Sequence, residues 1–173
     1  MPKGHFHIRR AMVKDAAEIA LIYNQAIEER MATFNTERVT EEEIIERIKN
    51  NNGRHPVFVA VLNSTNKVIG WASISPYSPR VCYNGIGEVS VYVEKGYRGH
   101  GVGSALLQSL IEEARQKGYW KLIGRILIFN EVSRMLAKKA GFREVGVLEK
   151  HGKLGGRWID VVEVERLIPE NIL

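Results

Sequence analysis

Hydrophobic positions along the chain repeat with two different periods, and each period predicts one kind of element. Alternating or continuous apolar runs rich in Val and Ile predict strands at 5–11, 57–62, 68–75, 86–93, 121–129, 142–150 and 157–167. Apolar residues spaced three and four positions apart predict helices at about 15–29, 40–50, 103–117 and 130–140.

The resulting order of elements is β-α-α-β-β-β-α-β-α-β-β, without an internal repeat, a linker or a low-complexity segment. This order predicts an α/β fold, with one mixed sheet of about seven strands and four helices on both of its faces. The length of 173 residues suits a single domain over 1–173.

Capping and turn residues support these boundaries. Thr40 and Glu43 form a capping box that opens the second helix, and Asn130 is a good N-cap for the fourth. The link 76–85 is irregular and rich in groups suited to face a ligand. The run 121–129 is nearly all apolar, as expected for a strand covered on both faces. A glycine-rich segment at 152–156 is expected to join the last two strands.

Composition and charge narrow the function classes. Apolar residues make up 45% of the chain and charged residues 26%, as in ordinary globular proteins. No apolar run reaches the length of a membrane span, and the start, Met1 to His5, does not resemble a signal peptide, so we expect a cytoplasmic protein with no membrane attachment. The net charge of +5 arises from basic residues that alternate with acids, which argues against nucleic-acid binding and suits a polyanionic cofactor.

The cysteine and histidine residues do not indicate a metal site or a nucleophile. Cys82 is the only cysteine, so no disulfide framework exists, and we expect it to be a buried or half-buried bystander. His5 and His7 share one face of the first predicted strand, but no third ligand is in view and a surface role is expected. We therefore expect no metal site.

The stretch Glu88–Leu107 carries the clearest chemical signal. A β-branched run ends in a turn with glycines at 99, 101 and 103, and this turn opens directly into a helix. The missing Cβ atoms let a ligand approach the main chain, while the first-turn amides and the helix dipole favour an anion. The alternative is a tight turn without a ligand, in which the glycines weaken the helix start and nothing offsets that cost.

Two common phosphate loops do not fit this stretch. A P-loop requires Lys and then Ser or Thr after its second glycine, whereas Gly103 is followed by Ser104 and Ala105. A dinucleotide-binding loop that starts at Gly99 requires Gly or Ala at position 104. The pattern Arg-x-x-Gly-x-Gly over 98–103 instead resembles the pyrophosphate loop of the GNAT superfamily of acyl-CoA-dependent N-acyltransferases, whose element order is also similar.

Further motifs bring the resemblance closer to one group within that superfamily, the phosphinothricin and methionine sulfoximine acetyltransferases. They span almost the whole chain and comprise Ile22–Ala26 with Ala32–Phe34, Arg80–Tyr83 ahead of Glu88–Val93, Asn130–Leu136 with Ala140–Phe142, and Lys153–Val161. The resemblance implies acetyl-CoA as co-substrate, a small-molecule amine as acceptor, and a homodimer.

It also implies a set of cofactor contacts. The backbone of Val91, Tyr92 and Val93 would hold the pantetheine arm and polarise the thioester carbonyl. The pyrophosphate would be held by the glycine loop, which comprises Arg98, Gly99, His100, Gly101, Val102, Gly103 and Ser104. Asn130 and Ser133 would contact the far side of the cofactor, although helix capping explains both residues about as well.

The implied reaction is direct attack of a bound amine on the thioester, without an acyl-enzyme. Such attack requires a neutral amine, and Glu88 is our candidate base, acting directly or through a water. A carboxylate at the head of a buried central strand needs a reason. The alternative for Glu88 is an edge carboxylate in a salt bridge.

For the acceptor, Arg80 is a plausible carboxylate clamp, because a guanidinium matches a carboxylate with two hydrogen bonds. Phe34, Tyr77 and Tyr83 are candidates for the pocket wall, with core packing as the alternative for each ring. The segment 153–160 is expected to complete the pocket from a second subunit.

One departure from the superfamily pattern concerns the general acid. Many members carry Tyr or His where this chain has Ala137. Either the thiolate leaves without a protein acid, or another group such as Tyr92 protonates it. Two other functions stay open: a protein or peptide N-acetyltransferase, and a CoA-binding module with little turnover.

Overall fold

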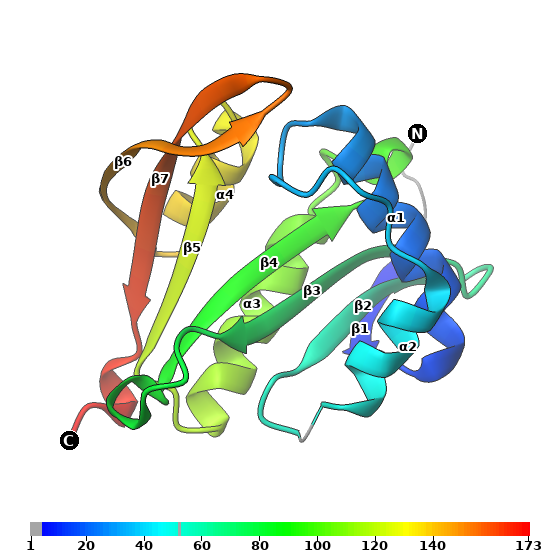
Figure 1. Cartoon of the computed structure of the whole chain (residues 1–173). Helices are drawn as coiled ribbons and strands as arrows, with labels where there is room; N and C mark the ends of the chain where they lie inside the picture. Colours follow the sequence, from blue (N-terminus) through cyan, green and yellow to red (C-terminus); the bar gives the residue numbers. More distant parts are fainter. Residues whose placement is uncertain (1–4, 52) are drawn as a thin grey trace.

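One seven-stranded sheet runs through the part of the chain that the computed structural model describes, residues 5–51 and 53–173 (Figure 1). Its strands are β1 (Phe6–Arg10), β2 (Val57–Leu62), β3 (Val68–Pro76), β4 (Ile86–Val93), β5 (Lys121–Leu127), β6 (Arg143–Leu154) and β7 (Arg157–Leu167). The helices are α1 (Ala16–Glu29), α2 (Glu41–Lys49), α3 (Val102–Gln116) and α4 (Glu131–Lys139). The expectations for the leading residues 1–4, and for 52 in the turn after α2, lie outside the described residues.

The sheet is mixed, as predicted. Its strand order is β1-β2-β3-β4-β5-β7-β6, and the first four strands pair antiparallel in sequence order. β4 and β5 pair in parallel, and β7 inserts antiparallel between β5 and the edge strand β6. The parallel pair requires a crossover, which α3 provides.

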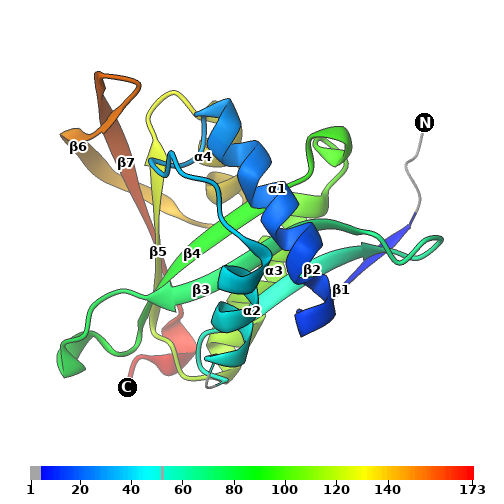
Figure 2. The same cartoon turned by 45° about the vertical axis from the view of Figure 1, so that its right-hand side comes forward.

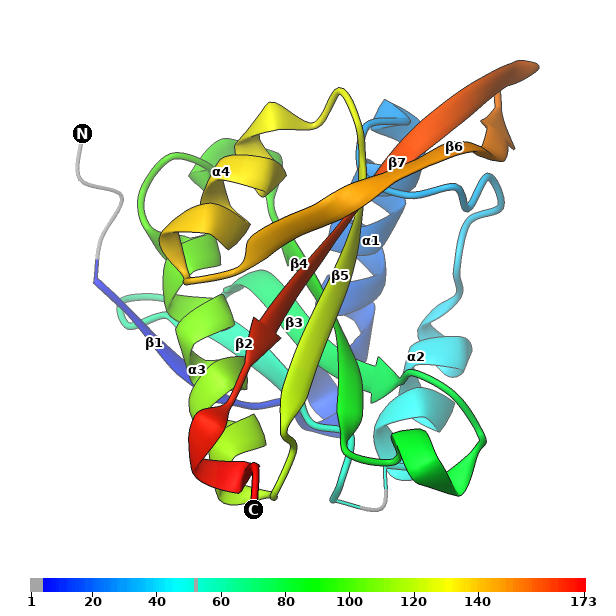
Figure 3. The same ribbon diagram turned by 90° about the vertical axis from the view of Figure 1, so that its left-hand side faces the viewer.

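Helices cover both faces of this sheet, which confirms the expected layers (Figures 2 and 3). The apolar residues of α1 and α2 pack with Val57, Val59 and Val61 of β2. Those of α3 and α4 belong to a second cluster, to which β2 contributes Phe58 and Leu62. Side chains alternate along a strand, so these two sets of residues lie on opposite faces of β2. The strand is therefore buried on both faces, and it contains no polar residue.

The predicted caps are present. The Thr40 hydroxyl accepts a hydrogen bond from the Glu43 amide at 3.2 Å, and the Glu43 carboxylate accepts one from the Thr40 amide at 2.8 Å. Asn130 Oδ1 likewise accepts from the Ser133 amide at 3.2 Å. These bonds satisfy amides that the first turn of a helix leaves without a helical acceptor.

Two strand predictions were wrong in extent. β5 ends at Leu127 and exposes Arg125, because its pairing with β4 stops before that residue, so the strand is not covered on both faces. β6 continues to Leu154, where Gly155 and Gly156 turn the chain at φ 59° and 78°. A register shift before Gly152 interrupts the alternation, and the sequence pattern therefore ends too early.

The expected burial of Cys82 was also wrong, since its side chain is exposed. It lies in the short 3-10 helix Val81–Tyr83, which contains no buried residue. This helix belongs to the link between β3 and β4, which projects beyond the ends of both strands (Figure 3). No helix in the described ranges combines the length and the apolar content that crossing a bilayer requires.

Candidate active site

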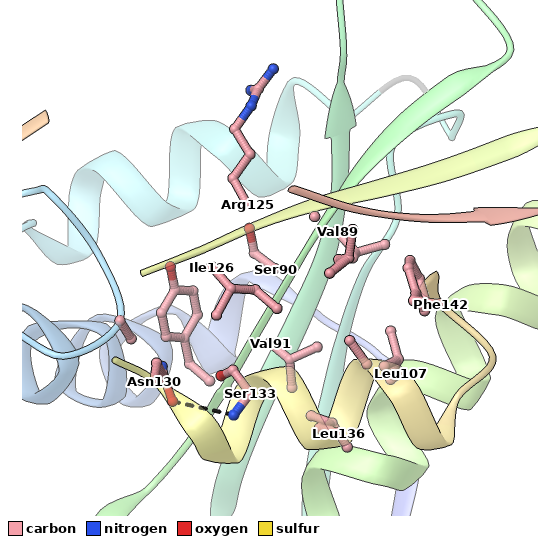
Figure 4. A pocket seen from close by; sticks show the side chains of 15 residues that line it. Val89, Ser90, Val91, Leu107, Arg125, Ile126, Asn130, Ser133, Leu136 and Phe142 are labelled. Atoms are coloured by element: carbon pink, nitrogen blue, oxygen red, sulfur yellow. Dashed lines mark hydrogen bonds between the residues drawn. The ribbon is translucent and has the colours of Figure 1, made fainter. Parts of the chain in front are cut away.

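A pocket opens where β4 and β5 separate. The two strands pair only from Ile86 with Lys121 to Glu88 with Ile123, and beyond that point they diverge (Figure 1). The pocket lies between the diverging strands and α4 (Figure 4). Its lining includes Val89, Ser90 and Val91 from β4, Arg125 and Ile126 from β5, and Ser133 from α4.

The start of α4 forms one wall of this pocket. Asn130 and Ser133 both line it, and the hydrogen bond between them caps the helix (Figure 4). Asn130 and Ser133 therefore take part in the cap of α4 and also line the pocket. Ala137 is buried one turn further on and also lines the pocket, so the position where many superfamily members carry an acid holds only a methyl group here.

The glycine-rich turn leads from the end of β4 into α3. Gly99 and Gly101 have φ values of 80° and 83°, a conformation that a side chain disfavours. The first recorded helical hydrogen bond runs from the Ala105 amide to the Gly101 carbonyl at 3.0 Å. The preceding amides of α3 have no helical acceptor, and this geometry suits an anion. His100 and Ser104 are exposed on the same turn.

The Arg98 side chain points to protein groups. Its Nη1 and Nη2 donate to the two carboxylate oxygens of Glu29 at 2.7 and 2.8 Å, and its Nε donates to the Val93 carbonyl at 3.0 Å. The hydrogen bond from Arg98 holds the pKa of Glu29 below its usual range. The sequence analysis did not anticipate Glu29, the last residue of α1, as a partner of this loop.

Glu88 forms an ion pair at the point where the strands separate. Arg125 Nη1 lies 3.2 Å and 3.4 Å from the two Glu88 carboxylate oxygens. This is the salt bridge that the alternative interpretation of Glu88 predicted. It also fixes a carboxylate beside the pocket, because Arg125 itself lines the pocket. The sequence analysis missed Arg125, although a charged residue in the middle of a largely apolar strand is a signal that could have drawn attention to it.

The β3–β4 link carries three predicted acceptor residues, and one of them, Tyr77, contacts this pair. The guanidinium of Arg125 lies 5.9 Å from the ring centroid of Tyr77. Tyr77 meets Tyr83 edge to face at 5.6 Å between centroids. The guanidinium of Arg80 lies 5.6 Å from the ring centroid of Tyr83, and Arg80 itself is exposed. A continuous series of contacts therefore connects Glu88 with Arg80.

Phe34 lies apart from that series. Its ring packs with Leu127, Leu154 and Val161, and a Cβ atom on Gly152 would come within 2.7 Å of it. The β6–β7 hairpin therefore contacts the α1–α2 loop of its own chain. The expectation that segment 153–160 completes the pocket from a second subunit stays a prediction.

Tyr92 belongs to an aromatic cluster on the α1–α2 face of the sheet. Its ring stacks on Trp71 at 5.1 Å between centroids and lies 5.0 Å from Tyr23. Burial raises the pKa of the Tyr92 phenol well above its usual range, so it stays protonated at neutral pH. Tyr92 also lines the pocket.

The described side chains contain no cluster of three or more His, Cys, Asp or Glu that would hold a metal ion.

A sequence model of the acetyltransferase (GNAT) family matches residues 19–142. The chain belongs to this family. The match begins within α1 and extends through the diverging strands, the glycine loop and α4, so it includes all the pocket-lining residues except Val164 of β7.

GNAT relatives resemble the chain over nearly its full length. The L-methionine sulfoximine/L-methionine sulfone acetyltransferase of Pseudomonas aeruginosa is 34% identical, over 89% of this chain and 90% of that protein. The structure of a phosphinothricin acetyltransferase from Sinorhizobium meliloti, in complex with AcCoA, superposes with a TM-score of 0.89 at 29% identity, over 94% of this chain and 88% of the other. A ribosomal-protein-alanine N-acetyltransferase from Brucella melitensis reaches a TM-score of 0.90 at 36% identity, over 94% and 99%.

Proposed function

We propose that this acetyltransferase transfers the acetyl group of acetyl-CoA to the amino group of a small amino-acid-like acceptor of the phosphinothricin or methionine sulfoximine type. The observation that carries the proposal is the pocket between β4 and β5, with the glycine loop after one strand and the Glu88–Arg125 pair at the point of divergence. Acetyl-CoA suits the glycine loop, whose amides and positive-φ glycines favour a pyrophosphate.

The proposed cofactor contacts follow the order of the chain. The open edge of β4 at 91–93 offers backbone groups to the pantetheine arm, and the loop 98–104 offers its amides to the pyrophosphate. Asn130 and Ser133 face the cofactor from α4. Arg98 acts on the loop through Glu29 and Val93, because its side chain already donates to both.

In the proposed reaction the acceptor nitrogen forms a bond to the acetyl carbonyl carbon while the carbon–sulfur bond breaks. Glu88 takes the proton from the amine, directly or through a water, and the CoA sulfur leaves as a thiolate. Alignment of the two substrates can supply about 7–11 kcal/mol of the barrier. A positioned base adds about 10²–10⁴-fold.

Release of CoA thiol tests the proposal. The acceptor panel contains phosphinothricin, methionine sulfoximine, methionine sulfone, free amino acids, polyamines and N-terminal peptides. We expect activity on the sulfoximine or the sulfone, and a loss of about 10²–10⁴-fold in kcat for Glu88→Gln with little change in the KM for acetyl-CoA. Glu112→Gln, on the exposed face of α3, is the matched control. An unchanged kcat in Glu88→Gln would disprove the base assignment.

One observation favours a second candidate, a protein or peptide N-acetyltransferase. The structure from Brucella melitensis with 36% identity is described as acting on ribosomal-protein alanine. A peptide that begins with alanine therefore belongs in the panel, and activity on it alone would favour this candidate. Tight acetyl-CoA binding with no activity on any acceptor would favour a CoA-binding module.

The proposal includes a homodimer. The edge strand β6 exposes Val145 and Val147, which suits association with a second copy. Light scattering at micromolar concentration that gives the mass of one 19.6 kDa chain would contradict it.

A cytoplasmic location is also proposed, and a single free cysteine is consistent with it. The assignment of 1–173 to one domain stays a prediction.

A further inference from the structure

Arg47 extends from α2 onto the sheet face that carries Glu88. Its Nη2 donates to the hydroxyls of Ser73 and Ser75 at 3.1 and 3.2 Å. Its guanidinium lies 5.4 Å from the ring centroid of Trp71. Two hydroxyls and an aromatic ring therefore fix the position of a cation whose side chain is still exposed.

No carboxylate among the described residues forms an ion pair with Arg47, whereas Arg9, Arg98 and Arg134 each pair with an acid. The recorded hydrogen bonds of Arg47 all start from Nη2, and a guanidinium carries five N–H donors. Donors thus remain for an incoming anion. The hydroxyls that fix this guanidinium are neutral, so they do not compensate its positive charge, and that charge can attract an anionic ligand.

The sheet register places Arg47 beside the proposed base. Ser75 pairs directly with Glu88, and Ser73 pairs directly with Ser90. Residues directly opposite on neighbouring strands have Cβ atoms about 4.5–5.5 Å apart. Ser90 lines the pocket, so the anchor of the guanidinium and the wall of the pocket are neighbours on one face.

Ring contacts also connect Arg47 with the pocket wall. The guanidinium of Arg47 lies over the ring of Trp71, and Trp71 stacks on Tyr92 at 5.1 Å between centroids. Tyr92 lines the pocket. Only one aromatic ring therefore separates the Arg47 guanidinium from a side chain of the pocket wall.

We infer that Arg47 recognises the α-carboxylate of the acceptor amino acid. The inference rests on the proposed function and deepens it. An amino acid carries its amine and its carboxylate on one carbon, so a base and a carboxylate-binding cation must be close neighbours. Glu88 and the Ser73–Ser75 anchor of Arg47 satisfy this requirement. Arg47 is a better candidate than Arg80, which lies in the link 76–85 and contacts Tyr83.

Paired acceptors test this role. Methionine sulfone and its carboxamide share the amine and the side chain and differ only in the carboxylate. We expect the wild type to prefer the acid, and Arg47→Ala to lower kcat/KM for the acid by about 10- to 100-fold while that for the amide changes little. Arg47→Lys keeps the charge but loses the planar fork, so an intermediate preference is expected.

Control measurements separate this role from a loss of fold. Arg115→Ala removes an arginine from the surface of α3 and should retain the wild-type preference. The KM for acetyl-CoA and the melting temperature should stay near the wild-type values in Arg47→Ala. An equal loss of kcat/KM for acid and amide, or an unchanged preference, would overturn the inference.

The test also distinguishes this inference from the proposed function. If the wild type acetylates neither acceptor, calorimetric titration of the CoA-loaded protein with each one replaces turnover. Tighter binding of the acid that Arg47→Ala abolishes would support the carboxylate site even then. Equal binding of acid and amide, or no binding of either, would overturn it.

Discussion

Arg98 and Glu29 face each other with two parallel hydrogen bonds, at 2.7 and 2.8 Å, while the Nε of Arg98 donates to the Val93 carbonyl at 3.0 Å. Glu29 is the last residue of α1 and Val93 the last residue of β4. A single side chain therefore connects α1, β4 and the glycine loop. The two-pronged geometry holds the guanidinium in one orientation, which an exposed single hydrogen bond does not achieve.

The first prediction concerns this pair and cofactor binding. Glu29→Gln removes the charge partner of Arg98 and loosens the loop, so the KM for acetyl-CoA should rise about 3- to 10-fold, since a pair of this kind is worth about 1 kcal/mol. The KM for the acceptor and kcat should change less. Glu28→Gln is the control, because Glu28 forms an exposed ion pair with Arg38 and not with Arg98. Equal effects of the two substitutions would refute the role.

The second prediction concerns pH. Arg98 lowers the pKa of Glu29 in the folded state, so the pair adds stability above the unfolded pKa of about 4.3 and loses it as the pH falls through the lowered folded value. The difference in unfolding free energy between wild type and Glu29→Gln should thus be constant from about pH 7 to pH 5 and shrink below about pH 4. Urea titrations at four pH values measure it, and a difference that grows in acid contradicts the pairing.

The third prediction concerns the backbone of the glycine loop. Gly101 has φ 83° and its missing Cβ would meet nothing within 4 Å, so Gly101→Ala tests conformation without a clash. The left-handed conformation costs an L-residue about 1–2 kcal/mol, and we expect CoA binding to weaken about 5- to 30-fold. Gly146→Ala is the matched control, because its Cβ also meets nothing and its φ is not positive. Equal CoA affinities of the two variants, measured by calorimetry, would refute the prediction.

The fourth prediction concerns Tyr92 as a general acid. A phenol with a pKa raised by burial is a poor proton donor to a CoA thiolate, because an ordinary thiol already has the lower pKa, about 8.5 against about 10. Tyr92→Phe should therefore keep kcat within about threefold and leave the basic limb of the pH–rate profile unchanged. A loss of about 100-fold in kcat, with an unchanged melting temperature, would assign the acid to Tyr92.

The local elements of the fold were predictable from the sequence, and the positions of β5 and β6 in the sheet only in part. Thr40 caps α2 and Asn130 caps α4 as expected, because a cap involves residues three positions apart. The strand β2 lacks polar residues and is buried on both faces, as its composition indicates. The end of β5 depends on where a neighbouring strand stops pairing, and no pattern within β5 records that.

The candidate site was predictable only in part. The glycine loop, Asn130 and Glu88 stand out because their signals are contiguous or tied to one motif. Arg125, Glu29 and Arg47 act through partners 37, 69 and 26 positions away, at Glu88, Arg98 and Ser73. A sequence pattern carries no information on which distant side chain an arginine meets.

Local periodicity and contiguous motifs were sufficient to predict the order of elements, their caps, the glycine-rich turn and the resemblance to one group of acetyltransferases. The folded chain was needed to show where β4 and β5 part, which carboxylate holds Arg98, and that Arg47 and Arg125 approach the same sheet face beside Glu88. These encounters join distant segments, and they depend on strand register and helix packing, which arise from the summed burial of the whole core.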